Sequence, residues 1–193
     1  MEFKLFNYKG SPVTIDVWII LLFFIMSFNF ALSIIISIIV HEMAHTFMAD
    51  RFGYRVYGIK IGLFTGSASI DSNISQRDSI PITAAGPISN ILLYLIGFMI
   101  SFVLPFEFVK DFMEVNIYLA IFNSLPIQPM DGGVILKDVL MLKMRDRSKA
   151  SVIANYISLI SSIILLLLSS SFIMLLLSAI FIYHSIKLLG WIK

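Results

Sequence analysis

The sequence contains no cysteine, and only 13% of its 193 residues are charged, whereas 59% are hydrophobic. Without cysteine, neither a disulfide framework nor a thiolate metal site is possible, so a bound metal ion must use nitrogen and oxygen ligands. Soluble domains carry about 25% charged residues. The composition therefore predicts a membrane protein, and no basic stripe indicates a nucleic-acid partner.

Three long runs lack charged residues: Val17–Val40, Ile82–Val103, and the stretch between Ser151 and Lys187, which is interrupted only by His184. A membrane-spanning helix needs about 20 apolar residues. The runs predict an all-α membrane protein with one membrane-embedded domain over residues 1–193. Because the first run has no small-residue cleavage site, it is expected to be a retained span rather than a removed signal peptide.

The number of spans depends on how the first apolar segment is divided. A single helix from Val13 to Ala49 would be about 55 Å long at 1.5 Å per residue, and Ser27-Phe28-Asn29 forms a weak break within it. Dividing it there predicts a six-transmembrane-helix bundle with spans at about 13–26, 30–49, 82–104, 115–126, 151–168 and 172–189. Residues 105–114 and 137–149 are expected to be loops. Alternation in residues 57–64 and 67–70 predicts a small β hairpin or sheet on the cytosolic side.

The basic residues provide a test of this division. With six spans, all of the 14 lysine and arginine residues except Lys110 share one side of the membrane with both termini. Cytoplasmic loops are enriched in lysine and arginine, so that side is predicted to be cytosolic. A single span in place of the first two would weaken the bias. The expected protein is a multi-pass protein of the cell membrane.

The segment His41-Glu42-Met43-Ala44-His45 places two histidines four residues apart, on one face of a helix. This spacing lets two imidazoles bind one Zn²⁺ ion, with Glu42 beside the open coordination position as a general base. The alternative is a polar helix end at the membrane interface. Histidine and glutamate are costly within a bilayer and are rarely kept there without a function, which favours the metal site.

A catalytic zinc site needs a third protein ligand and an open position. Asp131 lies at a depth similar to that of the histidines, in the cytosolic half of the bilayer, and its charge with that of Glu42 balances Zn²⁺. Pro126 and Pro129 interrupt the helix before it, and Gly132-Gly133 permit a turn after it; a helix cap is the alternative role. The other candidates considered are Asp16, Asp138 and His184. We interpret His184 as a packing residue. A role in hydrogen bonding to a metal ligand is left open.

Three motifs of this chain resemble those of the site-2 proteases, which are intramembrane zinc metalloproteases. They are His41-Glu42-Met43-Ala44-His45, Gly86-Pro87-Ile88-Ser89-Asn90, and Asn123-Ser124-Leu125-Pro126-Ile127-Gln128-Pro129-Met130-Asp131-Gly132-Gly133. The resemblance implies one zinc ion bound by His41, His45 and Asp131, with Glu42 as the base. It also implies that Asn123 lies near the substrate carbonyl, where its amide helps to stabilise the oxyanion. Gly86, Pro87, Asn90, Pro126, Pro129, Gly132 and Gly133 are expected to be structural.

The implied reaction is hydrolysis of a peptide bond within or beside a transmembrane segment of a membrane-protein substrate. No PDZ-like insertion or CBS pair is evident, so we expect a minimal core. Two other functions remain: a membrane transporter with a metal site, since broken helices are typical of transporters, and a proteolytically inactive scaffold with a structural zinc ion. No motif indicates an oligomeric state.

Overall fold

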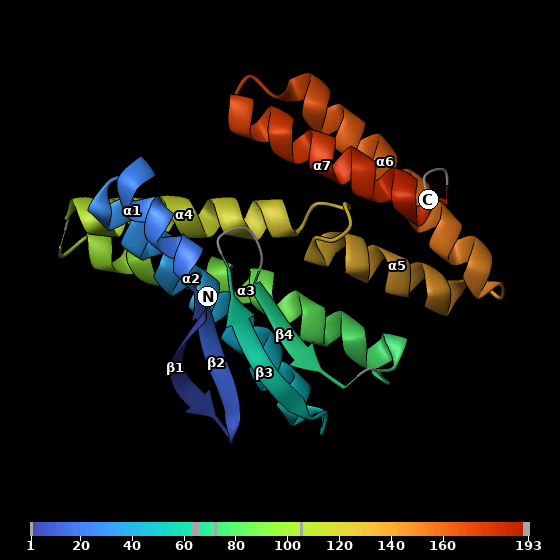
Figure 1. The fold of residues 1–193 in the computed structure, drawn as a ribbon, viewed down its shortest axis with the longest axis horizontal. Coiled ribbons are helices and arrows are strands. Elements are labelled where there is room, and N and C mark those ends of the chain that lie inside the picture. The colour runs from blue at the N-terminus through green and yellow to red at the C-terminus, as the bar shows by residue number, and fades with distance from the viewer. Residues whose placement is uncertain (1, 63–65, 72, 105, 191–193) are drawn as a thin grey trace. The chain divides into compact units, whose positions relative to one another are not determined.

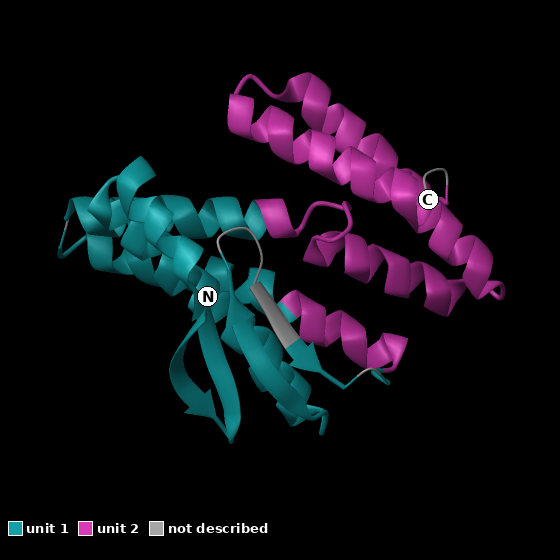
Figure 2. Cartoon of the chain, viewed as in Figure 1, with its two compact units in different colours: residues 1–74, 85–121 teal, residues 75–84, 122–193 magenta. Residues whose placement is uncertain are grey.

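The computed structural model describes residues 2–62, 66–71, 73–104 and 106–190 and is mostly helical with one small sheet (Figure 1). The chain divides into two compact units, which Figure 2 colours separately. Unit 1 comprises Met1–Ile74 and Ala85–Ile121, and unit 2 comprises Ser75–Ala84 and Phe122–Lys193. They are described in turn.

Unit 1 contains a four-stranded sheet with the order β1-β2-β3-β4. Strand β1 (Glu2–Tyr8) pairs antiparallel with β2 (Ser11–Asp16), and β2 pairs in parallel with β3 (Val56–Ile61). Strand β4 (Gly66–Ile70) pairs antiparallel with β3. The predicted β structure near residues 57–70 is therefore confirmed, although residues 63 and 64 lie outside the described residues. The first two strands of the sheet were not predicted.

The predicted helix at 13–26 is wrong over its first part. Val13 belongs to β2, is fully buried, and pairs with Ile59 of β3. The β-branched run Val13-Thr14-Ile15 suits a pleated strand, and the segment's hydrophobicity there reflects burial in the sheet. After β2 the chain forms a short 3₁₀ helix, η1 (Val17–Leu21), and a single turn, α1 (Leu22–Ile25).

The break predicted at Ser27 is confirmed, because this residue is the N-cap of helix α2 (Phe28–Arg51). The Ser27 hydroxyl accepts a hydrogen bond from the backbone N–H of Phe30 at 3.3 Å, which satisfies one of the free N–H groups at the helix start. Strand β2 precedes this helical segment and β3 follows it, so the chain leaves the sheet at Asp16 and returns to it at Val56. Figure 1 shows α2 beside the sheet.

The buried side of α2 is polar, which is unusual for an apolar helix of this length. Buried polar side chains recur along it at four-residue spacing: Ser33, Ser37, His41 and His45. Residues four apart share one helix face, so polar groups line the interior while the opposite face is apolar. This is the arrangement expected when lipid contacts the outside and a polar site occupies the inside.

Helices α3 (Gln76–Ser101) and α4 (Glu107–Asn123) differ from the predicted spans at their ends. Helix α3 begins at Gln76 rather than at Ile82, and residues 107–114, predicted as an acidic loop, are helical. Glu107 lies in the first turn of α4, where a carboxylate interacts favourably with the helix dipole. Charge therefore marked a helix start here, and α4 ends at Asn123 rather than at residue 126.

Unit 2 contains α5 (Asp131–Lys143), α6 (Arg147–Leu168) and α7 (Phe172–Leu188). The predicted loop at 137–149 is wrong for residues 137–143, which belong to α5. Asp146 then caps α6, accepting hydrogen bonds from the N–H groups of Ser148 (3.0 Å) and Lys149 (3.1 Å). Helices α6 and α7 match the last two predicted spans, and the Ser158 and Ser185 hydroxyls join them at 2.9 Å.

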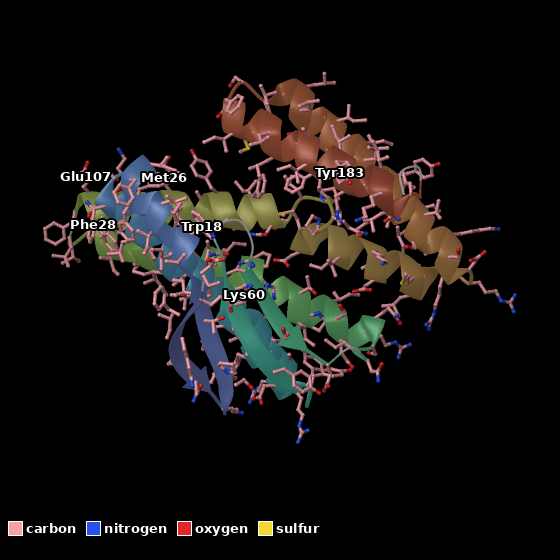
Figure 3. The ribbon with its side chains drawn as sticks, viewed as in Figure 1. Trp18, Met26, Phe28, Lys60, Glu107 and Tyr183 are labelled. Atoms are coloured by element: carbon pink, nitrogen blue, oxygen red, sulfur yellow. The ribbon has the colours of Figure 1, made fainter. Side chains whose placement is uncertain are left out.

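Among the described residues, three helices are long and apolar enough to cross a membrane: α2, α3 and α6. Helix α7 is apolar but has only 17 residues. The predicted count of six spans is therefore not confirmed, whereas the membrane character is supported. Large apolar side chains are exposed on η1 and α2, including Trp18 (59%) and Phe28 (67%), both labelled in Figure 3.

Candidate metal centre

His41 and His45 form a close pair on the polar side of α2. Their side chains are buried, as is that of Glu42 between them in sequence. The two Nε2 atoms lie 3.1 Å apart, and the ring planes are inclined at 84°. The four-residue spacing thus brings two imidazole nitrogens together within the interior of unit 1.

The pair fits a zinc ion. Zn–N bonds are about 2.0–2.1 Å long in a tetrahedral site, so two ligand nitrogens are expected about 3.3 Å apart. The observed separation of 3.1 Å between the Nε2 atoms is close to this value. A small rotation of either ring would accommodate the metal ion.

Gly86 on α3 leaves room beside these nitrogens. A Cβ atom on Gly86 would contact His45 Nε2, and it would lie 2.5 Å from His45 Cε1 and 2.6 Å from His41 Nε2. Ordinary contacts between such atoms are about 3.5–4.0 Å. Only glycine therefore lets α3 approach the pair this closely, which gives a physical reason for the first residue of the Gly86–Asn90 motif.

Asn90, at the end of the same motif, contacts the ring nitrogen of His41 that faces away from His45. Its Oδ1 lies 2.5 Å from His41 Nδ1, and its Nδ2 donates to Oδ1 of Asn116 at 2.9 Å. The predicted structural role of Asn90 thus becomes a direct contact with an imidazole. Asn116 was missed from the sequence, although an uncharged polar residue within an apolar helix is a recognisable signal of a buried polar contact.

In unit 2, the other predicted motif forms the connection from α4 to α5. Asn123 is the last residue of α4 and is half-buried. Pro126 and Pro129 lie between the helices, and Asp131 begins α5. A Cβ on Gly132 would overlap the backbone carbonyl of Ser124.

Gly133 is equally restricted, because a Cβ there would lie 2.5 Å from the carbonyl carbon of Ile127. The connection is held to α6 by the Gln128 backbone N–H, which donates to the Ser158 hydroxyl at 2.9 Å. Asp131 provides a carboxylate at the start of α5.

The remaining sequence candidates occupy other places. Asp16 caps η1, accepting a hydrogen bond from the backbone N–H of Trp18 at 3.3 Å. Asp138 lies within α5, and His184 is half-buried on α7 of unit 2.

Known proteins similar to this chain include zinc metalloproteases. The sequence model of peptidase family M50 matches residues 29–115. A Synechocystis protein named as a candidate zinc metalloprotease is 29% identical over 131 residues, which cover 65% of this chain and 35% of the relative. A zinc metalloprotease of Methanocaldococcus jannaschii is 26% identical over 168 residues, covering 79% of this chain and 49% of the relative. The chain thus spans about half or less of the length of these relatives.

A solved structure has the same fold. The site-2 protease from Methanocaldococcus jannaschii superposes with a TM-score of 0.72 at 23% identity, covering 100% of this chain and 97% of that one. The family match includes both histidines and Gly86 to Asn90. The chain is thus similar to peptidase family M50 over residues 29–115, and it has the fold of a site-2 protease.

Proposed function

We propose that this protein is an intramembrane zinc metalloprotease, which hydrolyses peptide bonds within or beside transmembrane segments of membrane-protein substrates. The observation that carries the proposal is the buried pair of His41 and His45, with Nε2 atoms 3.1 Å apart and Glu42 adjacent, on a helix apolar enough to span a membrane. The family match and the metalloprotease relatives support the same reaction.

In this proposal, His41, His45 and Asp131 hold one zinc ion, which supplies a Lewis acid and lowers the pKa of water in the site. Glu42 takes a proton from the attacking water and delivers it to the leaving amine. Two neutral imidazoles and one carboxylate leave a net charge of +1 with Zn²⁺. The carboxylate of Glu42 balances that charge, which reduces the cost of burial.

Asn123 is proposed to contact the substrate carbonyl. Its position at the end of α4 and its partial burial suit an amide donor that is held in place by a helix yet reachable by substrate. Such a donor contributes through hydrogen bonding to the oxyanion that develops during attack. Replacing Asn123 with alanine is expected to lower kcat more than it raises KM.

The deciding experiment compares the parent with Glu42→Gln in detergent or lipid vesicles, measuring bound zinc by elemental mass spectrometry and cleavage of a transmembrane substrate. The proposal predicts that zinc remains and cleavage is lost. Glu107→Gln, which changes an exposed glutamate at the start of α4, is the matched control and should behave like the parent. Absence of cleavage by the parent would overturn the protease proposal and leave a transporter or scaffold. Cleavage by Glu42→Gln at the parent's rate would overturn the role of Glu42 as the base.

The substrate is proposed to pair with the outer edge of β4, since the sheet formed by the described residues ends at this strand. An unwound segment gains backbone hydrogen bonds by adding to such an edge. Proline substitutions along β4 should reduce cleavage, because proline removes a donor and disfavours pairing. Equivalent substitutions along β1, the opposite edge, serve as the control. Unchanged cleavage by the β4 variants would refute this mode of binding.

Both termini and the site are proposed to lie on or near the cytosolic side of the cell membrane. Because the parent has no cysteine, single-cysteine variants report accessibility without background. Lys9→Cys and Arg145→Cys are expected to react with a membrane-impermeant reagent only after the cells are opened. Lys110→Cys is expected to react from outside in intact cells. The reverse pattern would overturn the orientation.

A further inference from the structure

A chain of buried side chains leads from His41 on α2 to α3 and α4, and returns to Ser37 on α2. His41 Nδ1 lies 2.5 Å from Asn90 Oδ1, and Asn90 Nδ2 donates to Asn116 Oδ1 at 2.9 Å. Asn116 Nδ2 then donates to the Ser37 hydroxyl at 2.8 Å and to the backbone carbonyl of Phe112 at 2.8 Å. Asn90, Asn116 and Ser37 are each 0% exposed, and buried polar groups of this kind are normally hydrogen-bonded.

The backbone carbonyl of Phe112 determines the direction of every hydrogen bond in this chain. A carbonyl oxygen only accepts, so the Asn116 atom beside it must be the donating Nδ2. Asn116 therefore presents Oδ1 to Asn90. Because this oxygen only accepts, Asn90 must donate to it through Nδ2. The Oδ1 of Asn90 is then the atom that faces His41. Because that oxygen only accepts, His41 Nδ1 must carry the proton.

A neutral imidazole has one protonated nitrogen and one with a lone pair. With the proton on Nδ1, the lone pair of His41 lies on Nε2, the atom that faces Nε2 of His45. A metal ion binds through a lone pair, and the hydrogen bond made by the other nitrogen selects which tautomer is present. The carbonyl of Phe112 is thus connected to the metal-binding atom through two asparagine amides.

We propose that Asn116 is a positioning residue that sets the tautomer of His41 through Asn90, and so keeps Nε2 available to a metal ion. Asn116 contacts neither imidazole in this chain of hydrogen bonds; it acts by holding the Asn90 amide in one of its two orientations. If that amide inverted, its NH₂ group would face His41 Nδ1 and favour a proton on Nε2. The proposal deepens the proposed metalloprotease site, on which its functional importance rests.

The test reads the tautomer directly in metal-free protein. Histidine is labelled with ¹⁵N, and the ring-nitrogen shifts of His41 are recorded near pH 8. The chain has 3 histidines, so His184→Gln and His45→Gln variants assign the spectrum. In the parent, Nδ1 of His41 should show the shift of a protonated nitrogen and Nε2 that of a nitrogen with a lone pair.

Asn116→Leu removes the carbonyl that orients Asn90, so the two tautomers of His41 should become mixed, and zinc affinity should fall about 10- to 100-fold. Asn116→Asp keeps an oxygen that accepts from Asn90 and should retain the parent tautomer. Asn155→Leu, which removes a buried asparagine of α6 in unit 2, is the matched control and should leave the His41 spectrum unchanged. If the leucine variant does not fold, Asn116→Ala takes its place.

A double variant separates orientation from packing. A carboxylate accepts through either oxygen, so Asn90→Asp needs no partner to orient it. The variant carrying both Asn90→Asp and Asn116→Leu should therefore recover the Nδ1-protonated tautomer that Asn116→Leu alone loses. An unchanged His41 spectrum in Asn116→Leu, or no recovery in the double variant, would overturn the proposal. Either result leaves the protease proposal intact, because that proposal is tested separately by zinc binding and cleavage in Glu42→Gln.

Discussion

Replacing Gly86 with alanine tests whether the space beside the histidine pair is needed for metal binding. The added Cβ would lie 2.5 Å from His45 Cε1 and 2.6 Å from His41 Nε2, about 1 Å closer than an ordinary contact. Relief requires either rotation of an imidazole or retreat of α3. Metal–ligand distances tolerate deviations of only about 0.2 Å, so either movement should disrupt the site.

The expected result is a large loss of zinc affinity with a small change in stability. Overpacking costs about 1–3 kcal/mol, while alanine gains about 0.8–1.0 kcal/mol over glycine within a helix. The net destabilisation should therefore be at most about 2 kcal/mol. Zinc affinity should fall at least about 10-fold, as it does when groups supporting metal ligands are changed.

The assay is competition for zinc against a fluorescent chelator, together with thermal unfolding followed by circular dichroism. Gly97→Ala is the matched control, because its Cβ would also be crowded, at 2.7 Å from the Met113 Cγ atom, yet a flexible methionine can move aside. Gly97→Ala should bind zinc like the parent. Parent-like affinity in Gly86→Ala, or equal losses in both variants, would refute the reasoning.

Three further outcomes are expected. Ser158→Ala leaves the buried N–H of Gln128 without its acceptor and should lower the free energy of unfolding by about 1–3 kcal/mol; Ser162→Ala, whose hydroxyl donates only within α6, should cost less, and equal losses would contradict the reasoning. Chelation of zinc should lower the melting temperature, since a ligand at 100 times its Kd stabilises by about 2.7 kcal/mol; an unchanged melting temperature would argue against a bound metal. Hydrogen bonds from the Arg55 backbone N–H and, second, from the Tyr57 hydroxyl lower the pKa of Asp71 below its ordinary value of 3.8. Tyr57→Phe should therefore raise the pKa of Asp71 in an NMR titration. The stabilisation from ionised Asp71 should then be lost at a higher pH during acidification.

Local sequence patterns predicted the parts of the fold that local forces determine. The helix around His41 and His45, its start after Ser27, and the last two helices follow from apolar composition, capping and spacing. Hydropathy did not predict the correct secondary structure where one apolar run contains both a buried strand and an exposed helix. Val13 is apolar because it pairs with Ile59 in the sheet, whereas Phe28 is apolar on an exposed helix surface, and composition alone does not distinguish these environments.

The sequence by itself determined the membrane class of the protein, the absence of thiolate ligands, and the identity of the histidine pair with its adjacent glutamate. Only the tertiary structure decided what surrounds that pair. Gly86 approaches the imidazoles from α3, and the chain from His41 to Ser37 joins residues separated by 49, 26 and 79 positions. Periodicity reports which face of one helix is buried, but not which residue of another helix it meets. Those contacts depend on the packing of whole helices, and they determine the orientation of the side chains around the histidine pair.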